Sequence, residues 1–446
     1  MGRTDTVDEF VDTLSRNRRG HHTGVYSVCS AHPVVIECAL RQAESDGGFA
    51  LIESTSNQVD QFGGYTGMTP AEFVAFVGRI ADAIGFPRDR ILLGGDHLGP
   101  NSWQDRPAAT AMTHAERLVA DYVAAGYRKI HLDASMRCAD DAGNRHEPLA
   151  NEVVAERTAR LCAAAERAHQ EASTDADPVY IVGSEVPIPG GAQDAEEELR
   201  VTSPERAAAT LDAIEREFRR NGLDDAWNRV VGLVVQPGVE FGDETVVAYD
   251  RASARELSAF ITTRERIVFE AHSTDYQSES ALTEMVNDHF CILKVGPWLT
   301  FAYREAVFAL SFIEDELATS EGFVASGVRA ALDEAMTEEP KYWSRYYSGT
   351  DAERAFKRKY SLSDRSRYYW PNAKVAAAVA ALDRNLRGGT IPLSLTSQFM
   401  PDAFPAVLDG RVASTPESLI RAHVRGVLGT YARACARPCG LHSSPT

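Results

Sequence analysis

Two histidines end apolar runs of the sequence, and one of them follows an aspartate. Asp96-His97 ends one run, and His272 ends another. An imidazole can bind a divalent metal, while a neighbouring carboxylate acts as a base on the bound substrate. Adjacent residues of a regular strand point to opposite sides, so Asp96 and His97 act together only where the strand breaks. The preceding Gly94-Gly95 favours such a break.

Polar residues end other apolar runs in the same way. Glu185 ends the run that begins near residue 179, and Gln236 ends the run that begins at 230. Histidine, carboxylate and amide groups together form a plausible set of ligands for a divalent ion, which can be Zn, Mn or Mg. The predicted metal-binding residues are His97, Glu185, Gln236 and His272.

A polar loop after residue 53 suits a polyhydroxylated ligand. Residues 53–67 are dense in amides, hydroxyls and glycines, and each sugar hydroxyl needs both donors and acceptors. Strand alternation also puts His131 and Asp133 on one face, where Asp133 can orient a hydroxyl or a metal-bound histidine, while His131 fits a buried structural role better. The predicted substrate-binding residues are Ser54, Asn57, Gln58, Asp133, Ser135, Ser273 and Asp275.

Basic residues near the eighth run and in a later loop are candidates for binding an anion. Lys294 and the backbone N–H near Gly296 lie where barrels commonly bind phosphate. Arg365 and Arg367, in a loop rich in tyrosine and serine, are further candidates. The predicted phosphate-binding residues are Lys294, Gly296 and Arg365.

Eight apolar runs, most of them rich in β-branched residues, must position these groups. They cover 25–32, 49–54, 91–97, 129–135, 179–185, 230–236, 267–272 and 290–296. Helical patterns lie between them, including 70–84, 114–125 and 203–221. Eight β–α units in about 300 residues predict an α/β protein with a (β/α)8 TIM barrel, and a doubly wound open sheet is the main alternative.

The remaining chain predicts additions at both ends of the barrel. We expect a helical lead-in at 1–20, the barrel at 21–320, a helical C-terminal extension at 321–435 and a flexible tail at 436–446. A helix over 301–317 is expected to close the eighth unit.

Composition excludes several classes of function. The 446 residues carry a net charge of −18, which repels nucleic acid and anionic lipid. No run of about 18 apolar residues predicts a membrane span, and the seven scattered cysteines without a CxxC pair indicate a cytoplasmic protein. The phosphate-binding patterns GxxxxGK[ST] and GxGxxG are missing, which disfavours a kinase.

Long segments of the sequence resemble the Z-type subunit family of bacterial tagatose-bisphosphate aldolase. The resemblance runs from about residue 20 to about 435. It is carried by the segments Ser27–Pro33, Glu53–Pro70, Gly94–Pro100, His131–Ser135, Gly183–Gly190, Val235–Glu240, Glu270–Gln277, Leu293–Pro297 and Tyr368–Pro371.

The resemblance implies a class II aldolase-like barrel in which His97 and His272 bind metal and Asp96 handles a proton. A metal-binding histidine of class II aldolases is replaced by Gln236, and Glu185 is available to complete the ligand set. Some members of the family are ketose-phosphate 4-epimerases, and others were named as non-catalytic partners of an aldolase subunit. Asp96 and Glu185 are therefore the expected base and acid.

The resemblance favours a metal-dependent 4-epimerase that interconverts D-tagatose 6-phosphate and D-fructose 6-phosphate. One alternative is a non-catalytic subunit that stabilises D-tagatose-1,6-bisphosphate aldolase, and another is a stand-alone aldolase. The expected partners are the phosphorylated ketohexose and either further copies of the chain or an aldolase catalytic subunit.

Overall fold

Eight parallel strands form a closed barrel in the computed structural model, which describes residues 5–144, 148–172, 176–183, 199–318 and 323–436. The strands are β1 (Val25–Cys29), β2 (Ala50–Thr55), β3 (Ile91–Leu98), β4 (Lys129–Asp133), β5 (Val179–Gly183), β6 (Val230–Val235), β9 (Val268–Ala271) and β10 (Phe290–Val295). Their order around the barrel is β1-β10-β9-β6-β5-β4-β3-β2. The prediction of a (β/α)8 barrel is confirmed.

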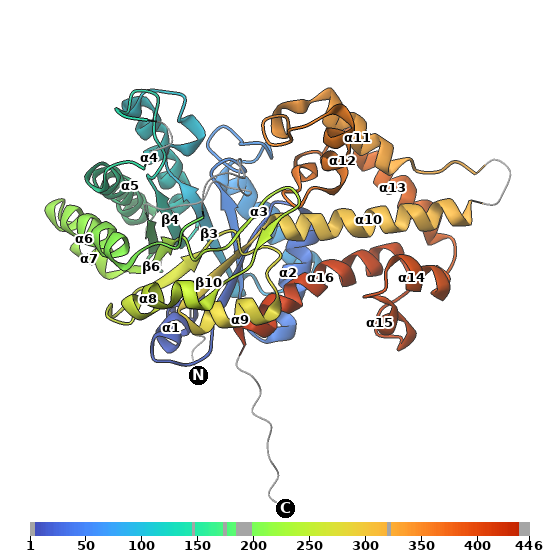
Figure 1. The fold of residues 1–446 in the computed structure, drawn as a ribbon, viewed down its shortest axis with the longest axis horizontal. Helices are drawn as coiled ribbons and strands as arrows, with labels where there is room; N and C mark the ends of the chain where they lie inside the picture. The colour runs from blue at the N-terminus through green and yellow to red at the C-terminus, as the bar shows by residue number, and fades with distance from the viewer. Residues whose placement is uncertain (1–4, 145–147, 173–175, 184–198, 319–322, 437–446) are drawn as a thin grey trace, which may run out of the picture.

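Helices surround the barrel and follow its strands (Figure 1). They are α2 (Pro33–Asp46), α3 (Pro70–Ile84), α4 (Ala108–Ala125), α5 (Asn151–Ala172), α6 (Pro204–Arg220), α7 (Asp224–Asn228), α8 (Arg251–Ile261) and α9 (Glu279–Asn287). The predicted helix 70–84 has its expected bounds because Pro70 sits in its first turn and Glu72 accepts the Thr69 N–H at 2.8 Å. A two-stranded hairpin of β7 (Glu240–Phe241) and β8 (Val246–Val247) follows β6.

The lead-in helix α1 (Thr6–Arg18) packs against the apolar lower half of the barrel interior. Its Phe10 and Leu14 belong to one buried cluster with inward residues such as Leu51 and Ile292. A second, larger cluster fills the layer between the strands and the outer helices. Burial of these apolar side chains is the main force that holds the layers together.

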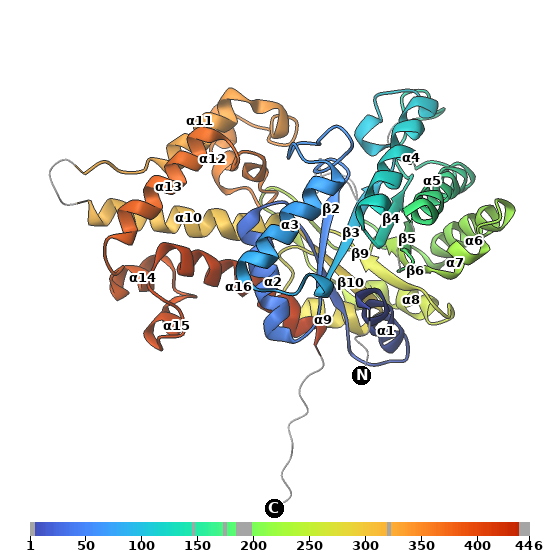
Figure 2. The same ribbon diagram turned by 180° about the vertical axis from the view of Figure 1, so that it is seen from behind.

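The chain beyond β10 is helical, including the part of 321–435 for which the sequence predicts a helical C-terminal extension. It comprises α10 (Pro297–Leu317), α11 (Val328–Glu338), α12 (Asp351–Tyr360), α13 (Ala373–Arg387), α14 (Leu393–Phe399), α15 (Phe404–Leu408) and α16 (Pro416–Cys435). Both ribbon views show α10 extending sideways from the barrel with these helices packed around it (Figure 2). The domain boundaries expected from the sequence stay a prediction.

The eighth position of the outer layer differs from the sequence prediction. We expected residues 301–317 to close the last unit, and this segment is indeed helical within α10. However, α16 packs against both α2 and α9 and so fills the place between them. The C-terminal helix therefore returns to complete the barrel, while α10 carries the extension outward. In the part of the chain described, none of the helices combines the length and apolar character that crossing a membrane requires.

Candidate metal-binding active site

The upper half of the barrel interior is lined by charged side chains instead of apolar ones. Along β9 the inward residues change from Val268 to Glu270, and along β10 from Ile292 to Lys294. The same alternation turns Glu53 of β2 inward, two residues after the apolar Leu51. Each of these three strands thus contributes an apolar residue to the lower core and a charged residue to the upper half.

These charged groups form a continuous buried network. Lys129 Nζ lies 2.7 Å from Glu53 Oε1 and 2.6 Å from Glu270 Oε2. Lys294 Nζ lies 2.9 Å from Asp96 Oδ1 and also pairs with Glu53. We call these five residues, Glu53, Asp96, Lys129, Glu270 and Lys294, the charged floor of the site.

A break in β3 brings Asp96 and His97 to the same site, as the flanking glycines predict. The pairing of β3 with β4 shifts register between Gly95 and Leu98, and His97 has a φ of 50° in the left-handed region. At Gly99 a Cβ atom would lie 1.6 Å from the Asp133 carbonyl oxygen, so only glycine fits. The distorted strand end therefore depends on these glycines.

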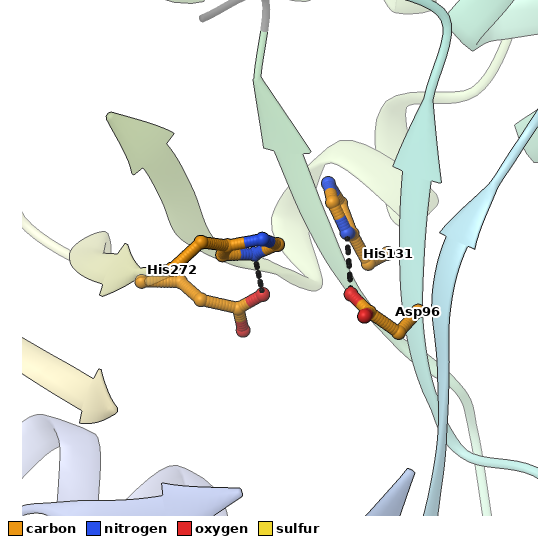
Figure 3. Close-up of side chains that lie close together, drawn as sticks. Asp96, His131 and His272 are labelled. Carbon is orange, nitrogen blue, oxygen red and sulfur yellow. Dashed lines mark hydrogen bonds and ion pairs between the residues drawn. The ribbon is translucent and has the colours of Figure 1, made fainter. Parts of the chain in front are cut away.

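Three imidazole rings meet above the floor. The His97 ring centroid lies 4.9 Å from that of His272, and both lie 5.2 Å from His131. His131 Nδ1 is 3.1 Å from Asp96 Oδ1, and His272 Nε2 is 3.0 Å from Glu270 Oε1 (Figure 3). Asp133 Oδ2 lies 2.9 Å from His97 Nδ1 and fixes that ring.

Asp96, His131, Glu270 and His272 can hold a metal ion. Each offers one ligand atom, and the four atoms lie within 4.8 Å of one another. His131 Nε2 is buried and has no hydrogen-bond partner among the described residues. Around the site, the buried carboxylates of Glu53, Asp96 and Glu270 face the two ammonium groups of Lys129 and Lys294, and the buried carboxylate of Asp133 pairs with His97. Buried charges need compensation, so this set of donors fits a divalent cation.

The surroundings of Asp96, Glu270 and His272 keep these groups in the protonation states that bind a metal ion. Burial alone would raise the pKa of Asp96, but His97, Lys294 and His131 outweigh it and hold that pKa well below its usual range. Lys129 and Lys294 have the same effect on the pKa of Glu270. Burial lowers the pKa of His272 to about 4, which keeps its imidazole neutral, the form that binds metals.

The site opens into a cavity of about 730 Å³ between the barrel and the C-terminal extension. This volume lies within the range typical of small-molecule sites. Of the predicted residues, the cavity is lined by Asn57, Gln58, Asp96, His97, His272, Ser273, Asp275, Lys294 and Gly296. The extension contributes Arg367, Tyr368 and Trp370, so the cavity walls come from both parts of the chain.

Several predicted residues lie away from this cavity. The Ser54 hydroxyl bonds to the Tyr122 and Tyr127 hydroxyls at 3.1 and 3.0 Å, so it faces the helix layer instead of a substrate. Asp133 and Ser135 form a second layer, in which the Ser135 hydroxyl donates to Asp133 at 2.6 Å. Arg365 is buried with its guanidinium 3.4 Å from the centre of the Tyr346 ring.

Two predicted ligands among the described residues, His97 and Gln236, are not part of the four-residue cluster. Gln236 Oε1, the atom a metal would need, accepts the N–H groups of Gly238 and Val239 at 2.7 and 3.1 Å. Gln236 therefore stabilises its own loop. Glu185 lies outside the described residues, so its predicted roles as ligand and catalytic acid or base stay predictions.

The sequence analysis did not assign Glu53, Lys129 and Glu270 to the site, and it gave His131 a structural role. A signal was present, because a charged residue inside an otherwise apolar strand must find a buried partner. Glu53 in Ala50–Thr55 and Glu270 in Val268–Ala271 fit that description.

The fold and the site together define a (β/α)8-barrel protein with a buried set of His, Asp and Glu residues suited to a metal ion. The chain belongs to the family of D-tagatose-1,6-bisphosphate aldolase subunit GatZ/KbaZ-like proteins, which it matches over residues 10–436.

The chain is also similar to several solved structures. A protein from Sinorhizobium meliloti 1021, described as a "probable tagatose 6 phosphate kinase", is 47% identical with a TM-score of 0.84, over 92% of this chain and 100% of that one. A fructose-bisphosphate aldolase from Campylobacter jejuni is 11% identical with a TM-score of 0.44, over 84% of this chain and 90% of that one. The YdjI aldolase from Escherichia coli K12 is 10% identical with a TM-score of 0.41, over 84% of this chain and 98% of that one. The last two matches are too weak to bear on the chemistry.

Proposed function

We propose that this protein is a divalent-metal-dependent 4-epimerase that interconverts D-tagatose 6-phosphate and D-fructose 6-phosphate. The observation that carries the proposal is the buried cluster of Asp96, His131, Glu270 and His272 at the base of a cavity large enough for a sugar phosphate. A subunit that served only as a scaffold would have no need for such a costly concentration of buried charge.

The chemistry of a 2-ketose favours an aldolase-type route for inversion at C4. The C4 proton is not next to the carbonyl, so enolisation cannot remove it. Retro-aldol cleavage instead breaks the C3–C4 bond after a base takes the C4 hydroxyl proton, and it leaves a three-carbon enolate and an aldehyde. Rotation of the aldehyde followed by re-formation of the same bond inverts C4, with no net change in atoms or oxidation state.

The protein groups divide this work between them. Asp96, His131, Glu270 and His272 would hold the ion, which when bound polarises the ketose carbonyl. Asp96 is ionised, because the cations around it hold its pKa well below the usual range, and the carboxylate oxygen that does not bind the ion is the proposed acceptor of the C4 hydroxyl proton. Glu185 remains the second proposed acid–base group on the strength of the sequence.

The protonation state of Lys294 argues against a Schiff-base mechanism on this residue. Burial opposes the charge of Lys294, but Asp96, Glu53 and Glu270 are among the groups that outweigh burial and raise its pKa well above the usual value. A protonated amine cannot attack a carbonyl carbon. Lys294 therefore acts as a fixed positive charge beside Asp96, 2.9 Å from its Oδ1.

The test uses the purified protein alone, treated with chelator and then supplied with Mg²⁺, Mn²⁺ or Zn²⁺. Tagatose 6-phosphate is the substrate, and formation of fructose 6-phosphate is followed. We expect metal-dependent conversion, with kcat reduced roughly 10²- to 10⁴-fold in Asp96→Asn. His272→Ala should lose both the bound metal and the activity, while His423→Ala on α16, outside the site, retains both.

Three other results would contradict the proposal. Accumulation of triose products without an epimer would indicate a stand-alone aldolase. Lack of turnover with every metal, together with activation of a separate aldolase catalytic subunit, would indicate a non-catalytic partner. Full activity in chelator would exclude the metal-dependent mechanism.

A further inference from the structure

The cavity contains few positive charges that a substrate phosphate could use. Lys294 is already surrounded by Glu53, Asp96 and Glu270. The Gly296 N–H donates to Asp275 Oδ1 at 3.0 Å. The groups at the end of β10 are therefore engaged with acidic side chains of the protein itself.

Two other cavity arginines are likewise paired with carboxylates. Arg387 Nη2 lies 3.0 Å from Asp383 Oδ2. Arg421 Nη2 lies 2.8 Å from Glu37 Oε1 and 2.6 Å from Glu417 Oε1. An incoming phosphate would have to compete with these acidic partners.

Arg367 differs because its hydrogen-bond partners are backbone carbonyl oxygens and a hydroxyl, which hold the guanidinium without a carboxylate ion pair. Its Nη1 donates to the carbonyl oxygens of Ser363 and Asp364 at 2.5 and 2.8 Å, and its Nη2 donates to the Tyr368 hydroxyl at 3.1 Å. Within the described residues, no hydrogen bond or ion pair joins this guanidinium to a carboxylate. A guanidinium has five N–H donors, so these three bonds fix the group and leave two donors for a ligand.

Two tyrosine rings surround Arg367 at the cavity wall. Its guanidinium carbon lies 4.6 Å from the centre of the Tyr368 ring, and the Tyr65 ring packs edge-on to Tyr368 at 4.5 Å. Tyr65 comes from the polar loop after β2, whose Asn57 and Gln58 line the same cavity. The loop and the extension therefore meet at this arginine.

The carboxylates of Asp364 and Asp275, which act electrostatically on Arg367, make their hydrogen bonds to other groups. Asp364, three residues before Arg367, is already bonded through Oδ2 to Thr300 at 2.5 Å and through Oδ1 to Ser366 at 2.6 Å. Asp275 accepts the Gly296 and Trp298 N–H groups, so its carboxylate is also occupied. In a chain of net charge −18, a fixed cation that lines the active-site cavity is a selective feature for an anion.

We propose that Arg367, held by Tyr368 and the 363–364 carbonyls, binds the phosphate group of the sugar substrate. This inference rests on the proposed function for the identity of the sugar, and it assigns the phosphate to the C-terminal extension instead of to Lys294. The extension thereby becomes part of the active site. Planar guanidinium groups suit this task because they can donate two parallel hydrogen bonds to a phosphate.

The experiment compares the binding of fructose 6-phosphate and of fructose to the full-length protein by calorimetry, without requiring turnover. We expect the wild type to prefer the phosphorylated sugar, and Arg367→Gln to weaken fructose 6-phosphate binding roughly 10- to 100-fold while fructose binding changes less than about twofold. Arg367→Lys keeps the positive charge but loses the planar pair of N–H donors, so it should retain part of the preference for the phosphorylated sugar. The matched control Arg387→Gln removes a cavity arginine that is already paired and should retain the full preference.

The outcomes separate this inference from the proposed function. If Arg367→Gln keeps the wild-type preference, or the wild type has none, the inference is wrong. If the wild type does not epimerise but its preference for the phosphorylated sugar disappears in Arg367→Gln, the phosphate site stands and the proposed function fails. Should the glutamine variant unfold, a reduced preference in a folded Arg367→Lys supports the site, and an unchanged preference overturns it.

Discussion

Asp96 and Asp275 are both buried at the same end of the barrel, yet their carboxyl groups respond to burial in opposite ways. The cations around Asp96 overcome the effect of burial and hold its pKa well below the usual range. Burial instead raises the pKa of Asp275 to about 6, because its partners are the neutral N–H groups of Gly296 and Trp298. Glu240 responds to burial in the same way as Asp275, and its pKa is raised to about 7.

The difference teaches how position in the fold sets the charge state. Regular strands turn alternate residues inward, and barrel closure puts acids and lysines at facing positions of the charged floor. Asp275 and Glu240, which we call the rim, lie beyond the barrel strands, where mainly backbone N–H groups and hydroxyls are available. Asp96, Glu270 and Lys294 of the floor therefore stay charged across physiological pH, whereas the rim titrates near pH 6 to 7.

Removing a cation from the floor should produce the largest loss of folding stability. Lys129 is fully buried between Glu53 and Glu270, so Lys129→Met leaves two buried carboxylates with one cation fewer. We expect the free energy of unfolding to fall by about 3–5 kcal/mol, measured by urea denaturation. Lys341→Met, which removes an exposed pair with Glu339, should cost less than about 1 kcal/mol.

A double variant sharpens this test. Lys129→Met combined with Glu270→Gln removes one charge of each sign and should recover a substantial part of the loss. If the single variant is nearly as stable as the wild type, the carboxylates of the floor are not held as paired ions, and the contrast with the rim fails.

The sequence predicts the barrel better than it predicts the floor. Strand-end residues such as His97 and His272 converge as expected, because parallel strands of a closed barrel end at one face. The Lys129–Glu53 and Lys294–Asp96 pairs join residues far apart in the chain, so they follow from closure and register and not from a local pattern.

Local side-chain conformation explains other differences. Gln236 ends a strand as predicted, but its oxygen turns back to the next loop. The prediction favoured Arg365, whereas Arg367, two residues later on the same 3-10 turn (Arg365–Tyr368), is the one that lines the cavity. Such choices depend on packing against α10 and on the preceding loop, which no spacing rule encodes.

At the rim, Asp275→Asn should remove a loss of folding stability that grows as the pH rises. The folded-state pKa of about 6 exceeds the ordinary value of 3.8, so the folded protein binds more protons between these values and loses stability as pH rises through this window. Asparagine stays neutral and keeps an oxygen for Gly296 and Trp298. We expect the variant to gain up to about 3 kcal/mol relative to wild type at pH 7.5, with little difference below pH 4.

Denaturation at several pH values between 4 and 7.5 measures this difference. Asp105→Asn, at an exposed position, is the matched control for replacing a carboxylate by an amide. A gain for Asp275→Asn that is equally large at low and high pH would mean that Asp275 is not the titrating group.

We expect the smallest loss of stability from the contact that joins the C-terminal helix to Thr274, the residue before Asp275 of the rim. The Tyr431 hydroxyl of α16 donates to the Thr274 carbonyl oxygen at 2.7 Å, and the Thr274 hydroxyl donates to the Lys294 carbonyl oxygen at 2.6 Å. Tyr431→Phe removes one of these buried bonds and should lower the free energy of unfolding by about 1–2 kcal/mol. Metal affinity, measured by calorimetry, should change less than about twofold, because the floor is held by its own ion pairs. A much weaker affinity for metal in this variant would show that the rim positions the floor, and that the two regions act as one.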